Sequence, residues 1–96
     1  NEDAIFTVSS DRFCRKVLSY IIGEQKSVKE ISNESGIPIG TVYRKINLLK
    51  KQNLLKITGV ITTDAKKVFY YKSRIRTIYT KYENGVFDVE IIPNSF

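Results

Sequence analysis

The feature that most constrains the fold is the close spacing of helix start and stop signals after Ser27. Ser27 and Glu30 form an S-x-x-E capping box, in which each side chain accepts a backbone N–H that the first helical turn leaves unpaired. Gly36 can adopt the left-handed conformation of a turn, and Pro38 suits the first position of a new helix, where no N–H is needed. Asn53, which tolerates positive φ, can close that second helix. The spacing therefore predicts two short helices joined by a tight turn.

The second of these helices has two unlike faces. Val42, Ile46 and Leu49 recur at i, i+4 and i+7, which predicts a buried stripe. At about 100° per residue, the opposite face is polar and basic, with mixed residues at its flanks. It carries Gly40, Arg44, Asn47 and Lys51, flanked by Thr41, Tyr43 and Leu48. Two short helices joined by a glycine-containing turn form a helix-turn-helix, whose second helix enters the major groove of DNA.

A further helix is predicted upstream, capped by Ser10 or Asp11 and ending near Gly23. Its apolar residues follow the i, i+4 spacing: Phe13, Cys14, Val17, Leu18, Ile21 and Ile22. Residues 1–9 show no decisive period, and no element is predicted for them. The single Cys14 cannot form an internal disulfide, and we interpret it as a small buried apolar residue rather than a redox sensor.

After Asn53 the hydrophobic period changes to two, which predicts strands. The residues expected to face inward are Leu55, Ile57 and Ile61, and those expected to face outward are Lys56, Thr58 and Thr62. Residues 62–66 make a polar tip, and residues 67–72 are rich in β-branched and aromatic side chains. We therefore expect a β-hairpin, or wing, directly after the basic helix.

A second hairpin is predicted around Asn84-Gly85, the strongest short signal for a two-residue type I′ turn. The turn sets the register as Glu83–Val86, Tyr82–Phe87, Lys81–Asp88, Thr80–Val89 and Ile78–Ile91. One face then gathers Ile78, Tyr82, Phe87, Val89 and Ile91. This apolar face needs cover, because two isolated strands are marginal in water. The cover is either a second copy of the chain, which would make a homodimer, or the first helix of the same chain.

Charge is distributed unevenly along the chain. The segment 44–81 holds eleven basic residues against one acid, Asp64, whereas residues 82–96 hold three acids and no base. The basic residues are Arg44, Lys45, Lys50, Lys51, Lys56, Lys66, Lys67, Lys72, Arg74, Arg76 and Lys81. A net charge of +6 concentrated in this way is expected of a protein that neutralises phosphates. The plainer alternative is a solvated lysine-rich face.

Composition excludes several classes of protein. At 96 residues, with 42% hydrophobic and 27% charged side chains, we expect one globular domain, residues 1–96. No apolar run approaches the roughly 18 residues of a membrane span and no signal peptide is recognisable, so a cytoplasmic protein without membrane contact is expected.

With no histidine and one cysteine, we expect no metal and no cofactor. No nucleophile with its base is recognisable, so the chain is not expected to be an enzyme. It begins at Asn1 and contains no methionine, so it is either processed or part of a longer protein.

The run from Ser27 to Leu55 resembles the helix-turn-helix of winged-helix transcription regulators of the ArsR and TrmB type, especially archaeal ones. The resemblance covers residues 10–72 and rests on the capping box, the glycine turn, Thr41-Val-Tyr-Arg and the leucines that open the wing. It implies an α+β winged helix-turn-helix, a three-helix bundle with a β-hairpin wing, to which residues 74–92 add a C-terminal β-hairpin. The chain lacks the paired cysteines and the histidines of the metal-sensing members. It also lacks the long effector domain of sugar-responsive relatives, so the sequence names no ligand pocket.

The resemblance also implies which residues meet DNA. The base edges would be met by residues near the start of the second helix: Ile39, Gly40, Thr41, Tyr43 and Arg44. Arg44 can grip guanine O6 and N7 in a bidentate manner. Phosphates would be neutralised by Lys50, Lys51, Lys56, Lys66 and Lys67, and Lys45 and Asn47 complete the expected set. The function implied is sequence-specific binding of double-stranded DNA in transcription regulation, and the alternative is a protein-interaction or RNA-binding module.

Overall fold

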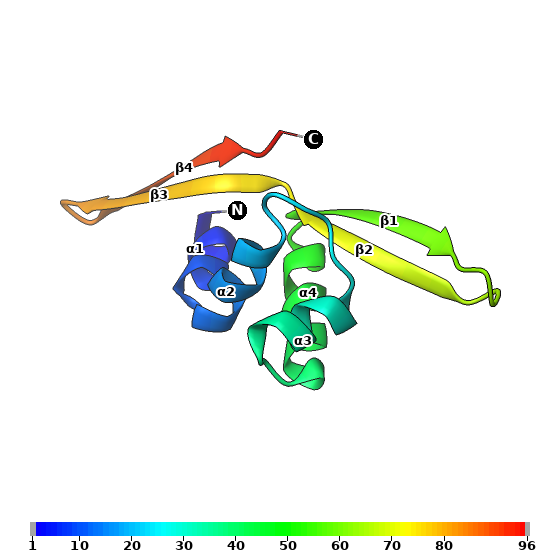
Figure 1. Ribbon diagram of the computed structural model, residues 1–96. Coiled ribbons are helices and arrows are strands. Elements are labelled where there is room, and N and C mark those ends of the chain that lie inside the picture. The colour runs from blue at the N-terminus through cyan, green and yellow to red at the C-terminus, as the bar shows by residue number, and fades with distance from the viewer. Residues whose placement is uncertain (1, 96) are drawn as a thin grey trace.

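In residues 2–95, which the computed structural model describes, four helices are followed by two β-hairpins (Figure 1). The helices are α1 (Glu2–Ser10), α2 (Arg12–Tyr20), α3 (Val28–Ser35) and α4 (Ile39–Lys51). Strand β1 (Leu55–Ile61) pairs antiparallel with β2 (Lys67–Ser73), and β3 (Ile75–Glu83) pairs antiparallel with β4 (Val86–Pro93). The predicted α+β class is confirmed.

The boundaries of α3 follow the predicted signals. The Glu30 N–H donates to Ser27 Oγ at 3.1 Å and the Ser27 N–H donates to Glu30 Oε1 at 2.9 Å, which completes the capping box. Gly36 ends the helix with a φ of 76°. Pro38 is not the first residue of α4, as the sequence suggested. Its ψ of 138° is extended, so it takes the N-cap position, and its carbonyl accepts the Val42 N–H at 3.1 Å.

Asn53 closes α4 as predicted, with a φ of 59°. The Asn53 N–H donates to the Lys50 carbonyl at 2.9 Å, and the Leu54 N–H donates to the Leu49 carbonyl at 3.1 Å. These two bonds form a Schellman motif, which satisfies carbonyls that the end of a helix leaves unpaired. Leu49 and Leu54 are both buried, so the closure also fixes where β1 leaves the helices.

The N-terminal part of the chain differs from the prediction. Residues 1–9 were not assigned an element, but α1 is a helix that buries Ile5 and Val8. Asp11 caps α2, because its Oδ1 accepts the N–H groups of Phe13 at 2.8 Å and Cys14 at 3.0 Å. The helix ends at Tyr20, before Gly23.

One apolar core lies between the helices and the base of the two hairpins. Its fully buried side chains, at most 1% exposed, are Val8, Cys14, Val17, Ile21, Ile31, Val42, Ile46 and Leu49. The predicted buried stripe of α4 is therefore confirmed. Cys14 is 0% exposed, which confirms its interpretation as a buried apolar residue. Leu55 and Ile75 add the first residues of β1 and β3 to this core.

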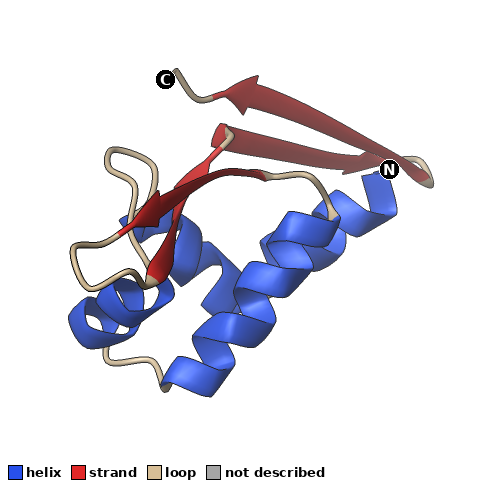
Figure 2. Ribbon diagram, turned by 90° about the vertical axis from the view of Figure 1, so that its right-hand side faces the viewer, coloured by secondary structure: helices blue, strands red, loops and turns tan. Residues whose placement is uncertain are grey.

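The first hairpin, strands β1 and β2, is called the wing here; it extends beyond the helices in Figure 1, and its tip faces the viewer in Figure 2. Lys26 and Tyr71 exchange two backbone hydrogen bonds, of 3.0 and 2.8 Å, which tie the loop before α3 to β2. The expectation that Ile57 and Ile61 face inward is wrong. They are 38% and 73% exposed, because the far half of this hairpin has no helix beneath it.

The C-terminal hairpin, β3 and β4, points in the opposite direction (Figure 1), and its register is confirmed at every predicted pair. Its base completes the core of the same chain, since Ile78 and Val89 pack against the helices. Phe87 meets the edge of Phe6, with ring centroids 4.9 Å apart. The tip is uncovered, and Tyr82 is 72% exposed.

A compact junction holds the two hairpins together. Arg74 alone separates β2 from β3. The Ser73 N–H donates to the Ile21 carbonyl at 2.9 Å. The Asn94 side-chain amide donates to the carbonyls of Ile22, at 2.7 Å, and Ser73, at 2.9 Å. The end of β4 is thereby bonded to the end of α2 and to the last residue of β2.

Candidate nucleic-acid interface

The outward face of α4 is the first part of the candidate site. Val42, Ile46 and Leu49 fix the rotation of the helix, because all three are buried. The residues turned away from the core are Ile39, Gly40, Tyr43, Arg44, Asn47, Lys50 and Lys51, all exposed, with Thr41 half-buried beside them. The helix therefore presents most of the predicted base-contacting residues on one surface.

Arg44 lies near the middle of this face. Its Nη2 donates to Thr41 Oγ1 at 3.0 Å, and among the described residues no carboxylate lies within ion-pair distance of it. A Cβ at Gly40 would stand 3.8 Å from Arg44 Nη1, an ordinary contact. The fold itself therefore has space for a side chain at position 40.

Lys45 does not belong to the outward face. Its Nζ lies 2.6 Å from Asp11 Oδ2, and the two side chains are only 21% and 28% exposed. This ion pair and the Cys14 N–H hold the pKa of Asp11 below its ordinary value. Lys45 joins α4 to the N-cap of α2, which is an internal role.

The wing lysines lie on β1, β2 and the tip between them. The Lys66 side chain is 80% exposed, with its Nζ 3.8 Å from Asp64. Lys67 Nζ stands 5.2 Å from the centroid of the Phe69 ring. Lys56 is exposed on β1, in register with Lys72 on β2. The wing thus carries several ammonium groups, of which Lys67 shares a hollow with Tyr43 of α4.

A hollow of about 290 Å³ lies between the wing and helices α3 and α4. Its lining residues are Ser27, Val28, Lys29, Tyr43, Lys67, Val68, Phe69 and Tyr71. Tyr43 therefore faces the wing. Burial raises the pKa of Tyr71 above its ordinary value. The sequence did not point to Lys29, Phe69 or Tyr71, because they meet Tyr43 only through the pairing of Lys26 with Tyr71.

The basic segment found in the sequence is divided by the fold. Arg76 and Lys81 lie on β3, in the hairpin that points away from the wing (Figure 1). Lys81 is also paired with Glu83 at 3.0 Å and stands opposite Asp88. These two basic residues are therefore not part of the candidate site.

The site offers cationic donors and aromatic rings on an exposed surface, a combination suited to phosphates and bases.

Among the described residues, no group of three or more His, Cys, Asp or Glu side chains is placed to hold a metal ion. None of the described helices combines the length and apolar character needed to cross a membrane. Compared with protein-family models, with curated proteins and with solved structures, the chain matches none of them.

Proposed function

We propose that this protein is a transcription regulator that binds double-stranded DNA sequence-specifically, as a winged helix-turn-helix that resembles the ArsR and TrmB type, especially those of archaea. The observation that carries the proposal is the exposed face of α4, with Arg44 near its middle and lysines at its end and on the adjacent wing. The order of elements supports it. A helix, a short bridge at Lys26, two helices and a hairpin follow one another, as in a winged helix.

In this proposal α4 lies in the major groove, which is wide enough to admit a helix. Arg44 gives up its bond to Thr41 and donates two N–H groups to guanine O6 and N7. Gly40 permits the helix backbone to come close to the DNA, which accounts for a glycine that no contact in the fold requires. Lys50, Lys51, Lys56, Lys66 and Lys67 neutralise phosphates and supply most of the affinity.

The proposal is tested first by selection of binding sites from random duplexes, which enriches a motif only if bases are read. Arg44→Ala should then weaken binding to the selected duplex by about 1–3 kcal/mol and relax the preference at one position. Equal binding by the variant and the parent would remove α4 from base recognition.

The role of the wing is tested through salt. Replacing Lys66 and Lys67 with alanine should weaken binding to every duplex alike and reduce the slope of log K against log salt by about 2. Lys16→Ala, a lysine on α2 outside the proposed DNA surface, is the control and should leave the slope unchanged. A slope unaffected by the double replacement would show that the wing does not touch DNA.

A second candidate function is the binding of single-stranded RNA. The observation that favours it is the exposure of Tyr43, at 53%, and Phe69, at 43%, beside Lys67, since bases stack on aromatic side chains. Phe69→Ala should then weaken binding to single-stranded RNA more than binding to duplex DNA. Competition between the two nucleic acids for the parent protein distinguishes the candidates.

We also propose that the protein acts as a homodimer joined through the C-terminal hairpin. The base of this hairpin is part of the core, but on its apolar face, Ile78, Tyr82, Phe87, Val89 and Ile91, Tyr82 and Ile91 are 72% and 40% exposed. Covering them with a second copy would bring two α4 helices to one duplex, where half-sites lie about one DNA turn, roughly 34 Å, or a multiple of it apart. Sedimentation tests this, with Tyr82→Asp as the variant expected to dissociate. A parent chain that is monomeric at tens of micromolar would refute it.

A further inference from the structure

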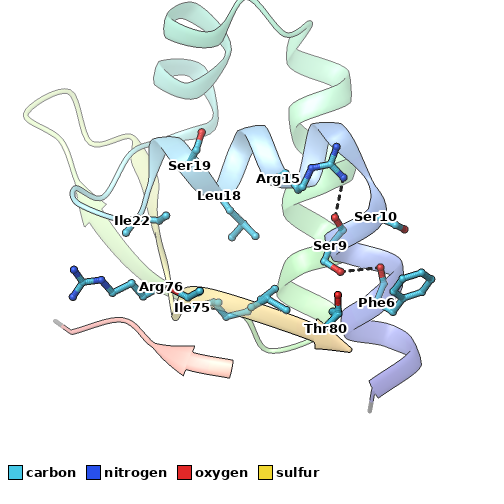
Figure 3. Close-up of a pocket in the computed structure, with 12 residues that line it drawn as sticks. Phe6, Ser9, Ser10, Arg15, Leu18, Ser19, Ile22, Ile75, Arg76 and Thr80 are labelled. Atoms are coloured by element: carbon cyan, nitrogen blue, oxygen red, sulfur yellow. Dashed lines mark hydrogen bonds between the residues drawn. The ribbon is translucent and has the colours of Figure 1, made fainter. Parts of the chain in front are cut away.

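A groove of about 420 Å³ separates the N-terminal helices from the C-terminal hairpin (Figure 3). Its apolar walls come from α1 and α2 on one side and from β3 on the other. They include Phe6, Leu18, Ile22, Ile75 and Ile78. The volume lies within the roughly 300–1,000 Å³ typical of small-molecule sites. It is therefore large enough for a ligand with a substantial apolar part.

The groove carries a cation where α1 meets α2. The Arg15 Nη1 donates to the Ser9 carbonyl at 2.9 Å, which holds the guanidinium where α1 meets α2 (Figure 3). An arginine carries five N–H donors, so this bond leaves others for a ligand. Arg76 also lines the groove, but its guanidinium points away from Arg15 in Figure 3. The lining contains no acidic residue.

The groove continues in one direction. A second hollow shares Phe6 and Thr80 with it and extends to Tyr82 and Phe87 near the tip of the hairpin. Asp3 stands in this second hollow, at the end away from Arg15. The two hollows together form an elongated apolar surface with Asp3 at one end and Arg15 near the place where the two hollows meet. A carboxylate held by Arg15 would have its chain directed away from Asp3, into the first hollow.

We propose that this groove binds a small amphipathic anion, a carboxylate with an unbranched apolar chain. The carboxylate pairs with Arg15, whose fork of N–H donors matches it in a bidentate manner. The chain lies on Leu18, Ile75 and Ile22, in the part of the groove away from Asp3 (Figure 3). The site lies outside the surface proposed for DNA and does not depend on DNA binding.

The test is calorimetric titration of the full chain, without nucleic acid, with sodium decanoate below the concentration at which it forms micelles. The parent should bind one decanoate per chain saturably. Arg15→Glu should weaken this binding about tenfold or more, since a charge-assisted pair is replaced by repulsion. Lys16→Glu makes the same charge change on the same helix, at a residue that does not line the groove, and should have no such effect.

A ligand of opposite charge tests whether Arg15 itself recognises the carboxylate. Decyltrimethylammonium has an apolar chain of the same length with a cationic head, and it should bind Arg15→Glu more tightly than the parent. Thr80→Trp should block both ligands, because the indole would fill the groove, and circular dichroism confirms that each variant is folded. Binding without saturation, equal binding of both ligands by the parent, or an equal loss in Lys16→Glu and Arg15→Glu would overturn the proposal.

Discussion

Removing Asp11 should destabilise the protein more than its position near the surface suggests, because one carboxylate has two structural roles. Its Oδ1 caps α2 and its Oδ2 pairs with Lys45 of α4. Loss of an N-cap costs about 1 kcal/mol. Loss of the ion pair adds about 1 kcal/mol, at the upper end of the range for exposed pairs, because both side chains are mostly shielded from water. Asp11→Ala should therefore lower the free energy of unfolding by about 2 kcal/mol.

Denaturant titration measures this loss, and a domain of this size should also melt roughly 10 °C lower. Asp11→Asn keeps a capping oxygen and removes the charge, so it should cost about half as much. Asp11→Asn and Lys45→Met, alone and together, form a double-mutant cycle. The stability losses of the two single variants should not add in the double variant, because each replacement already breaks the same ion pair. Additivity within about 0.5 kcal/mol would refute the coupling.

The same pair predicts a dependence on pH. The hydrogen bond from Lys45, with the Cys14 N–H, lowers the pKa of Asp11 in the folded protein below its ordinary 3.8. Because the folded pKa is the lower one, the stabilisation is complete above the unfolded value and is lost as pH falls through the folded value. The parent should therefore lose more stability than Asp11→Asn between pH 5 and pH 2, roughly. Parallel loss in both proteins would contradict the assignment.

Three further outcomes are expected. Gly40→Ala should stabilise the protein by up to about 1 kcal/mol and yet weaken binding to the selected duplex, and full affinity would refute close approach at this position. Burial raises the pKa of the Cys14 thiol to about 11, so at pH 8 a thiol reagent should react only after denaturant is added, whereas rapid native reaction would contradict this. Asn94→Ala should lower the free energy of unfolding by about 2 kcal/mol, measured with denaturant, because two carbonyls lose their donor.

The parts of the fold that the sequence predicted depend on residues close together in the chain. The capping box needs Ser27 and Glu30 alone, and the second hairpin follows from Asn84-Gly85. The outward face of α4 was predictable because helical geometry places Arg44 opposite Ile46 once the helix is assigned.

The errors arise where packing between distant segments decides. Lys45 was expected at the interface, but the docking of α2 on α4 brings it to Asp11, which lies 34 residues away. The period of two along β1 predicts that Ile61 is buried only if another element covers that face of the strand. Ile61 is exposed because the wing extends past the helices. In α1, Ile5 and Val8 are too few to establish a helical period, although they are buried.

The junction at Arg74 is the point from which the two hairpins extend in opposite directions (Figure 1). Strands of seven and nine residues span roughly 23 and 30 Å at about 3.3 Å per residue. Backbone hydrogen bonds hold this junction in place. The Arg74 N–H donates to the Leu54 carbonyl at 2.8 Å, and the Arg74 carbonyl accepts the Asn94 N–H at 2.9 Å. Both hairpins therefore start from one hydrogen-bonded point, and a substitution there would alter the base of the wing and the base of the C-terminal hairpin together.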